Sequence, residues 1–500
     1  MGAPPETTLR PGALTLEQLE ALAGGGRVGL EPACWPKVEA AALVVERAAQ
    51  GERPVYGINT GFGKLASRRV APGQILELQR RLVLSHMCGL GPPLPDQAVR
   101  LTLVLKAASL ARGHSGVRRE VVDALLDLYN HDVLPVIPAK GSVGASGDLA
   151  PLAHLAGCLL GLGEARLAGA TLPAADALAR IGRPPLTLAA KEGLALLNGT
   201  QVSTALALLA LFRARRVLEA ALVAGAMSVD AALGSDVPFT PRLNAVRGQP
   251  AQMRVAARLH ALLEGSGIRA SHLECDRVQD PYSLRCQPQV MGPCLELLET
   301  AGTTLEREAN GVSDNPLVFP EDDAILSGGN FHGEPVALAA DQIALALAEI
   351  GSLAERRIAL LTDASLSQLP PFLTPDPGLN SGFMLPQIAS SALAAENQHL
   401  AHPAGIDSRV TSAGQEDHVS MSTYAARRLL EMAENTARIV AIELLAGAQG
   451  IDLRRPLRSS PILERMVEAI RSQSPFVHDD RPLGGDIEAL AARILAGSFP

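Results

Sequence analysis

The sequence is poor in several features that would assign it to common functional classes. Only 3% of its 500 residues are aromatic, 19% are charged, and the formal net charge is −8. A mildly acidic chain has no basic surface for nucleic acid or for an anionic membrane, so neither partner is expected. Lysine occurs only at positions 37, 64, 106, 140 and 191. That scarcity leaves few candidates for Schiff-base or P-loop lysine chemistry.

Cysteine motifs and long apolar runs are also scarce. The six cysteines form no Cys-x-x-Cys pair, so they are typical of reduced thiols in a cytoplasmic protein and predict no disulfides. The N-terminal segment is polar and proline-rich and lacks the apolar core of a signal peptide. The longest apolar run, 193–212, contains Asn198 and Gln201, which favours a helix buried in protein over a membrane span. The sequence therefore predicts a soluble, cytoplasmic protein.

Alanine, leucine, arginine and glutamate at helical spacing dominate the chain, of which 47% is hydrophobic. Thr15 and Gln18 have the spacing of a capping box at the start of a short helix. The apolar period predicts further helices over 74–86, 97–112, 118–130, 202–228, 250–265, 336–363, 388–401 and 420–449.

Strand-like alternation is weak and confined to 54–60 and 324–329. We therefore expect a mainly α fold in which long helices pack as a bundle. The chain is long enough for two domains. Loops are frequent up to about residue 205 and long helices prevail after it, which predicts an N-terminal domain over 1–205 and a helix-bundle and C-terminal domain over 206–500.

One glycine-rich loop, PAKGSVGASGDLAP, combines several features in a short stretch. Asp148 is a residue type that caps helix N-termini, and a proline is tolerated in a first turn, so a helix should begin at about residue 149. Ala145, Ser146 and Gly147 then lie just ahead of a helix N-terminus, where the positive end of the dipole favours developing negative charge. Taken alone, the triplet would be an ordinary tight turn.

Two other motif readings of glycine-rich loops fail on spacing. Asp148 stands where the Gly-x-Ser-x-Gly nucleophile elbow requires its second glycine. The segment 57–64 resembles a P-loop, but Ile58 occupies the position of the first glycine and Leu65 that of the serine or threonine. Neither motif is predicted.

The stretch GSVGASGDLAPLAH resembles the signature of the aromatic amino-acid ammonia-lyase and aminomutase family, and the resemblance extends in order over about residues 50–455. In that family the Ala-Ser-Gly triplet cyclises without help into 4-methylideneimidazol-5-one (MIO), so no external cofactor is implied. The amide nitrogen of Gly147 would attack the carbonyl of Ala145, and glycine offers the least hindrance. Ser146 would lose its hydroxyl as water and leave an electrophilic methylidene carbon.

The resemblance also implies a fumarase/aspartase-like helical fold with a central bundle of long helices. It implies a homotetramer in which each active site is completed by residues from more than one subunit. The apolar faces of 202–228, 336–363 and 420–449 fit burial between subunits.

Further motifs imply the catalytic groups. YGINTGFG matches the family loop whose tyrosine removes the β-proton of the substrate, a role that falls on Tyr56. A free phenol titrates near 10, so its ionisation at pH 7 costs about 4 kcal/mol unless helix N-termini or cations stabilise the phenolate. LLNGTQ supplies Asn198, which in the family hydrogen-bonds the MIO carbonyl. SAGQEDHVSM supplies Gln415 and Glu416, and the glutamate belongs near the substrate side chain as an imidazole partner or second acid/base.

Three more motifs imply substrate-binding groups. QDPYSLRCQPQV contains Gln279, Tyr282 and Arg285, and the guanidinium of Arg285 suits a bidentate clamp on the substrate α-carboxylate. The resemblance implies that Tyr282 is a catalytic residue. SDNPL supplies Asn315 as a neighbour of the carboxylate or of MIO, and GGNFHGEP supplies Phe331, which packs by the ring.

Substrate choice is predicted mainly from the pair Ser85-His86, which matches the histidine-specific branch of the family. Phenylalanine-specific relatives have Phe-Leu at these two positions, and tyrosine-specific relatives have His-Leu. His86 should then bind the imidazole of the substrate. The chain departs from the branch at Gly414, where an asparagine is usual. The resemblance thus implies conversion of L-histidine to trans-urocanate and ammonia, the first step of histidine degradation.

Two other functions stay open at this point. A tyrosine- or phenylalanine-directed lyase or aminomutase would share the fold, and a non-catalytic scaffold could retain it without the chemistry. No metal site is predicted, because His399 and His402 have a suitable spacing but lack a third ligand.

Overall fold

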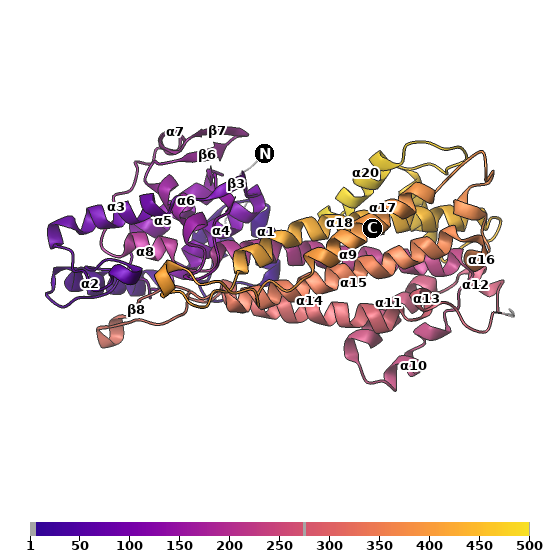
Figure 1. Cartoon of the computed structure of the whole chain (residues 1–500), viewed down its shortest axis with the longest axis horizontal. Helices are drawn as coiled ribbons and strands as arrows, with labels where there is room; N and C mark the ends of the chain where they lie inside the picture. The colour runs from indigo at the N-terminus through magenta and orange to yellow at the C-terminus, as the bar shows by residue number, and fades with distance from the viewer. Residues whose placement is uncertain (1–6, 274–276, 500) are drawn as a thin grey trace. The chain divides into compact units, whose positions relative to one another are not determined.

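A computed structural model describes residues 7–273 and 277–499, and it is mainly α-helical, which confirms the predicted fold class. The chain forms two compact units (Figure 1). Unit 1 comprises Met1–Leu209, Gly302–Asp341 and Pro403–Arg428, and unit 2 comprises Ala210–Ala301, Gln342–His402 and Leu429–Pro500. The division of the chain at residue 205 stays a prediction.

Unit 1 consists of medium-length helices joined by loops and small sheets. Its complete helices are α1 (Leu16–Ala23), α2 (Trp35–Gln50), α3 (Ile75–His86), α4 (Asp96–Leu110), α5 (Arg119–Asn130), α6 (Leu149–Leu159), α7 (Ala174–Arg180) and α8 (Glu192–Leu197). The core of the unit is formed by helices such as α4, most of which is buried. Long stretches of backbone remain as loops between these helices, and the candidate site is built from them.

The strands of unit 1 are short and pair in small sheets. They are β1 (Thr7–Leu9) with β2 (Val28–Leu30), β3 (Leu90–Pro93) with β5 (Pro138–Lys140), β4 (Leu134–Pro135) with β6 (Glu164–Leu167) and β7 (Ala170–Pro173), and β8 (Leu317–Phe319) with β9 (Ala324–Leu326). The first pair is parallel and the others are antiparallel. The loop that carries Ser146 runs from the end of β5 to the start of α6, so regular structure holds both of its ends.

Four long helices contribute residues to both units, namely α9 (Gln201–Ala231), α14 (Gln287–Ala309), α15 (Glu334–Thr362) and α18 (Ser422–Leu453). Within unit 2 they run side by side as a bundle (Figure 1). Arg357 of α15 and Glu443 of α18 form a fully buried ion pair, and Ser228 of α9 donates to the same carboxylate at 2.7 Å. Because a buried charge needs a partner, this pair fixes the three helices in one arrangement.

The remaining helices of unit 2 are α10 (Pro241–Ala245), α11 (Pro250–Leu263), α12 (Gly267–Ala270), α13 (Tyr282–Arg285), α16 (Ala364–Ser367), α17 (Met384–Leu400), α19 (Pro461–Arg471) and α20 (Gly484–Ala496). Helix α17 joins the bundle through Asn397, whose amide donates to Thr436 of α18 at 2.9 Å.

The predicted helices are confirmed to within a few residues, and the capping box of Thr15 and Gln18 is present at the start of α1. The apolar run 193–212 is buried at every position, as predicted, but residues 198–200 divide it between α8 and α9. The strand-like segment 54–60 forms turns, with only an isolated bridge at Thr60. Helix α15 is long and apolar enough to cross a membrane, but 67% of its most apolar stretch is buried within the protein, as in a core helix.

Candidate active site

A pocket of about 860 Å³ in unit 1 collects many of the predicted site residues. It is lined by residues from segments that are far apart in the sequence, including Tyr56, His86, Ala145, Ser146, Asn198, Asn315, Phe331, Gln415 and Glu416. All of them belong to unit 1. Loops supply most of this lining, and rigid helices position the loops, which is the usual construction of a binding site.

The Ser146 loop is held on one side by Gly199. Gly147 and Gly199 form a parallel bridge, and the N–H of Asp148 donates to the Gly199 carbonyl at 2.8 Å. Gly147 has a φ of 75°, and a β-carbon built on it would lie 2.2 Å from the Gly199 oxygen. No side chain fits at this position, so the triplet can end only in glycine.

On the other side, the start of α18 holds the same loop. Ser420 donates from Oγ to the Gly144 carbonyl at 3.0 Å, and the N–H of Met421 donates to the Val143 carbonyl at 2.8 Å. Gly144 has a φ of 68°, and an added β-carbon would lie 2.4 Å from Ser422 Oγ. The loop is therefore fixed by contacts with residues that follow it by more than 50 and by more than 270 positions.

Asp148 has a different role from the one predicted. Helix α6 begins at Leu149 as expected, but the Asp148 side chain makes no capping hydrogen bond. Its carboxylate instead accepts from the N–H and Oγ of Ser203 at 2.7 and 3.0 Å and from Thr423 Oγ1 at 2.6 Å. Burial raises the pKa of Asp148, and these hydrogen bonds offset part of that effect. Asp148 thus ties the Ser146 loop to the starts of α9 and α18.

Glu416 approaches the central residue of the triplet. Ser146 Oγ donates to Glu416 Oε1 at 3.2 Å, and Thr411 Oγ1 donates to Glu416 Oε2 at 2.6 Å. Thr411 and Glu416 also pair in an antiparallel bridge. The bridge and the threonine hydroxyl fix the carboxylate, so it is directed at Ser146 before any substrate binds.

Tyr56 lies in the same pocket, where its phenol is partly buried. The N–H of Gly63 donates to the phenol oxygen at 3.4 Å, and the ring of Phe62 makes an edge contact at 6.3 Å between centroids. Burial, followed by the charge of Glu416, raises the pKa of Tyr56. In the described part of the chain, the Gly63 hydrogen bond is the interaction that lowers this pKa. Among the described residues, neither a cation nor an α-helix N-terminus is one of the groups that shift this pKa.

Asn198 is oriented by a buried polar network. Its side-chain amide donates to the Asn315 backbone carbonyl at 2.9 Å, and its backbone carbonyl accepts from Lys106 Nζ at 2.5 Å. Lys191 and Asp314 form a buried ion pair at 2.6 Å beside it. Burial lowers the pKa of Lys106 to about 7. The polar end of Asn198 thus has a fixed direction within the pocket wall.

His86 is the last residue of helix α3, and hydrogen bonds hold one nitrogen of its imidazole. Its Nδ1 lies 2.8 Å from the Leu82 carbonyl and 3.0 Å from Ser85 Oγ. A carbonyl can only accept, so Nδ1 carries the proton and the lone pair is on Nε2. His86 therefore presents a hydrogen-bond acceptor as a lining residue of the pocket.

The sequence matches the family model for aromatic amino acid lyases over residues 14–472. The chain belongs to the aromatic amino acid lyase family. It is 60% identical to a histidine ammonia-lyase of Aromatoleum aromaticum, over 98% of this chain and 94% of that one. The crystal structure of histidine ammonia-lyase from Trypanosoma cruzi superposes with a TM-score of 0.91 at 41% identity, covering 99% and 94% of the two chains.

The same aromatic lyase fold is shared with enzymes of another reaction type. A tyrosine aminomutase from Streptomyces globisporus superposes with a TM-score of 0.93 at 35% identity, covering 99% of this chain and 98% of that one. The fold alone therefore does not determine which substrate binds. The side chains that line the pocket must determine it.

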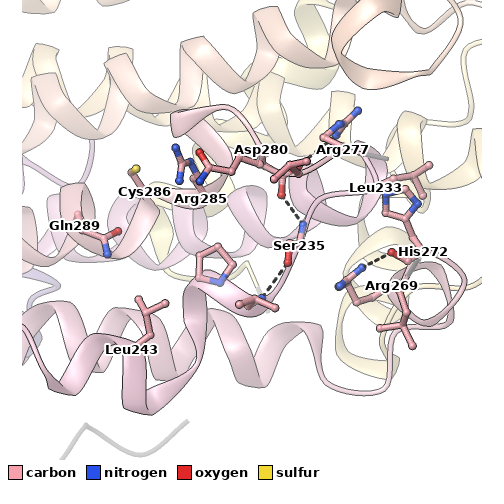
Figure 2. Close-up of a pocket in the computed structure, with 15 residues that line it drawn as sticks. Leu233, Ser235, Leu243, Arg269, His272, Arg277, Asp280, Arg285, Cys286 and Gln289 are labelled. Atoms are coloured by element: carbon pink, nitrogen blue, oxygen red, sulfur yellow. Dashed lines mark hydrogen bonds and ion pairs between the residues drawn. The ribbon is translucent and has the colours of Figure 1, made fainter. Parts of the chain in front are cut away.

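Three residues predicted for the active site of this family member lie in unit 2. Gln279 and Arg285 line a pocket of about 520 Å³, whose lining includes Arg269 and Arg277 (Figure 2). Tyr282 is 71% exposed, and the guanidinium of Arg285 lies 4.7 Å from its ring centroid. Arg285 Nε is buried and has no hydrogen-bond partner within the described residues.

Several contacts in and around the pocket of this aromatic lyase were not predicted from the sequence. Thr411 begins the stretch that carries Gln415 and Glu416, but the sequence does not indicate that its hydroxyl holds the Glu416 carboxylate. His332 and His418 line the pocket, and their rings stack at 5.7 Å. Because 86 residues separate these two histidines, no spacing rule could pair them.

If the triplet cyclises as the family resemblance implies, Gly147→Ala should prevent the cyclisation, because its β-carbon would overlap the Gly199 carbonyl. Gly182→Ala is a matched control: its φ is 71° and no atom lies within 4 Å of the added carbon. We expect both variants to lose about 1–2 kcal/mol of stability through the left-handed backbone. Intact mass should show the two-water deficit of a cyclised triplet in Gly182→Ala and not in Gly147→Ala. Equal processing of the two variants would contradict this account of the glycine.

Proposed function

We propose that this chain is a carbon–nitrogen lyase that converts L-histidine to trans-urocanate and ammonia. The observation that carries the proposal is the set of groups in one pocket: Ser146 lies beside Glu416, and Tyr56 and His86 line the same pocket. The full-length relatives support it, since proteins 57–60% identical over nearly the whole chain are named histidine ammonia-lyases.

We further propose that MIO forms from Ala145, Ser146 and Gly147. The loop fits that reaction: Gly147 has no room for a side chain, and residues 144 and 147 hold the backbone in left-handed conformations that tighten the turn. Once formed, the ring supplies an electrophilic carbon that activates the substrate amino group as a leaving group. No external cofactor is required.

Residues of the pocket supply the other catalytic and substrate-binding roles. Tyr56 acts as the base toward the β-proton, and Asn198, which lines the same pocket, hydrogen-bonds the MIO carbonyl. His86 accepts from the imidazole N–H of the substrate at Nε2, and Glu416 is the partner of the same imidazole or a second acid/base. Asn315, Phe331 and Gln415 complete the wall of the pocket.

We propose a cytoplasmic homotetramer in which Gln279, Tyr282 and Arg285 reach an active site from another subunit. The motif of Arg285 matches the family's carboxylate clamp, and its buried, unpartnered Nε indicates a donor that a further group satisfies. A carboxylate would satisfy it with a charge-assisted hydrogen bond.

The test is product analysis of purified protein with L-histidine, L-tyrosine and L-phenylalanine in separate reactions. We expect ultraviolet absorbance of urocanate and release of ammonia with histidine. We expect little product with phenylalanine, because its ring offers no donor to His86 Nε2, and tyrosine tests whether a phenol hydroxyl can replace the imidazole N–H. A β-amino acid product would indicate an aminomutase. Cinnamate or coumarate as the main product would overturn the histidine assignment, and no product with any of the three would favour a non-catalytic scaffold.

Glu416→Gln should move the alkaline rise of the reaction to lower pH. The charge of Glu416 raises the pKa of Tyr56, so a neutral amide should let the phenol ionise more readily. We would measure kcat/KM from about pH 7 to about pH 10 for both proteins. The substrate amine titrates equally in both, so only the difference between the curves reports the enzyme. A shift to higher pH would contradict Tyr56 as the titrating base.

A further inference from the structure

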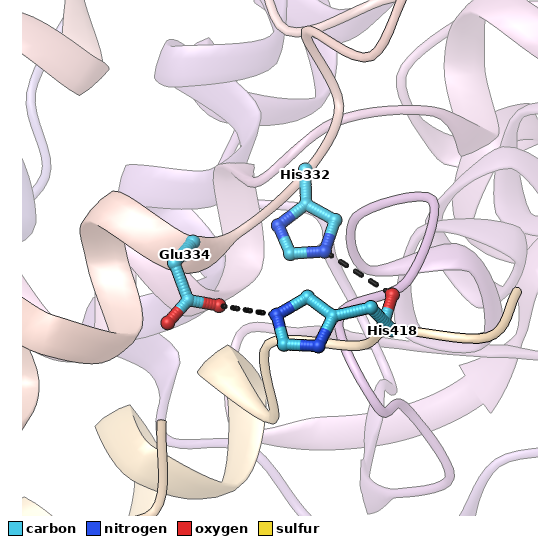
Figure 3. Close-up of side chains that lie close together, drawn as sticks. All are labelled: His332, Glu334 and His418. Atoms are coloured by element: carbon cyan, nitrogen blue, oxygen red, sulfur yellow. Dashed lines mark hydrogen bonds and ion pairs between the residues drawn. The ribbon is translucent and has the colours of Figure 1, made fainter. Parts of the chain in front are cut away.

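We propose that His332, Glu334 and His418 form a binding site for a divalent transition-metal ion of the zinc class in the wall of the Ser146 pocket. The three side chains each offer one ligand atom, and all three atoms lie within 4.8 Å of one another. They come from the loop before α15, the first turn of α15, and the loop before α18, as Figure 3 shows. Fold, not sequence spacing, brings them together.

The first support is the protonation state of His332. Its Nε2 lies 3.3 Å from the backbone carbonyl of His418, and a carbonyl can only accept a hydrogen bond. Nε2 therefore carries the proton, and the lone pair is on Nδ1. Metal-binding histidines are usually fixed in this way, by donating the other ring N–H to a carbonyl or carboxylate.

The second support is Glu334. Its Oε2 is buried and accepts no hydrogen bond from the described residues, and it lies 3.9 Å from His418 Nε2, which is too long for a hydrogen bond. A buried carboxylate oxygen without a donor is costly, so the structure holds an acceptor that a cation would satisfy. The two imidazole rings are parallel to within 1°, and His418 is 66% exposed, so its ring can rotate toward a bound ion.

The ligand set selects the type of ion. Two imidazoles and one carboxylate suit zinc and its transition-metal neighbours, whereas magnesium and calcium prefer oxygen ligands. Three protein ligands leave a fourth position open to water or to a small molecule. Glu334 begins helix α15, where the dipole disfavours a cation, but the effect of a helix end is weaker than three coordinate bonds.

His332 and His418 also line the pocket that contains Ser146 and Tyr56. A bound ion would therefore lie in the wall of the same pocket and offer its open position to molecules that enter it. The site is independent of the proposed function, because no ligand of the ion has been given a role in deamination.

The test is titration of the full-length, chelator-treated protein with Co²⁺ and with Zn²⁺, in the absence of histidine because free histidine chelates both ions. We expect one Zn²⁺ per chain by calorimetry and visible Co²⁺ bands of four-coordinate intensity, which Zn²⁺ removes. His332→Ala, His418→Ala and Glu334→Gln should each weaken binding by about 10²-fold or more, since even outer-shell changes cost 10–100-fold.

His399→Ala is the control, because His399 is an exposed histidine outside the cluster. It should bind both ions as the unchanged protein does, and all four variants should keep the same circular dichroism and thermal midpoint. Binding that survives all three cluster variants would overturn the proposal. So would a weak, six-coordinate Co²⁺ spectrum, or loss of binding in His399→Ala alone. Failure of histidine turnover would leave these measurements unaffected.

Discussion

Ser146→Ala should yield a folded protein with the full mass of its translated sequence and almost no turnover of histidine. The hydroxyl of Ser146 is the group that must leave as water for the methylidene carbon to form. Under the proposed chemistry, the triplet without this hydroxyl stays an ordinary turn, and the enzyme lacks its electrophile. We expect kcat to fall by about 10⁴-fold or more, because the chemical step then lacks the group that supplies most of the acceleration.

Intact mass spectrometry and the urocanate assay together measure this result. Ser67→Ala is the matched control, since Ser67 is an exposed serine of unit 1 outside the pocket. It should show the two-water deficit and normal turnover. A deficit that persists in Ser146→Ala would place the cyclised residue elsewhere in the chain. Turnover without a deficit would show that deamination does not need the ring.

Tyr56→Phe should separate cyclisation from catalysis. The variant keeps the ring packing against Phe62 and removes only the phenol oxygen, so the mass deficit should remain intact. Turnover should fall by about 10²–10⁴-fold, the usual contribution of a general base. Burial raises the pKa of Tyr56, so its proposed role as the base requires further groups that stabilise the phenolate.

Tyr129→Phe provides the comparison for Tyr56→Phe. Tyr129 is buried outside the pocket and donates to the Leu22 carbonyl at 2.8 Å. Loss of that hydrogen bond should lower stability by about 1 kcal/mol and leave turnover unchanged. If both tyrosine variants lose activity in proportion to their thermal midpoints, the effect of Tyr56 is on folding and it is not the base.

The sequence predicted the long helices well because their signal is local. The period of apolar residues in 336–363 and 420–449 anticipates α15 and α18 closely. The division of the buried run at residues 198–200 was not predicted. Gly199 lies in this break with a φ of 118°, and the backbone carbonyl of Asn198 accepts from Lys106, a contact distant in sequence that leaves no periodic trace.

The candidate site was predicted through its motifs, and the structure adds what motifs cannot contain. Asp148 was expected to cap α6 because its type and position fit, yet Ser203 and Thr423 compete for the carboxylate and bind it. The cluster of His332, Glu334 and His418 was invisible for the same reason. Groups that meet only after folding have no fixed separation along the chain.

The contacts that residues 420–423 make with the Ser146 loop determine when the enzyme can become active. Residues 420–423 contact the loop and are translated long after it, so the nascent chain cannot hold the triplet in its final shape until most of the polypeptide has left the ribosome. Under the proposed chemistry, formation of the electrophile then reports that folding has succeeded. A misfolded or truncated chain would remain chemically inert, and the cell would never contain a reactive methylidene on an unfolded surface.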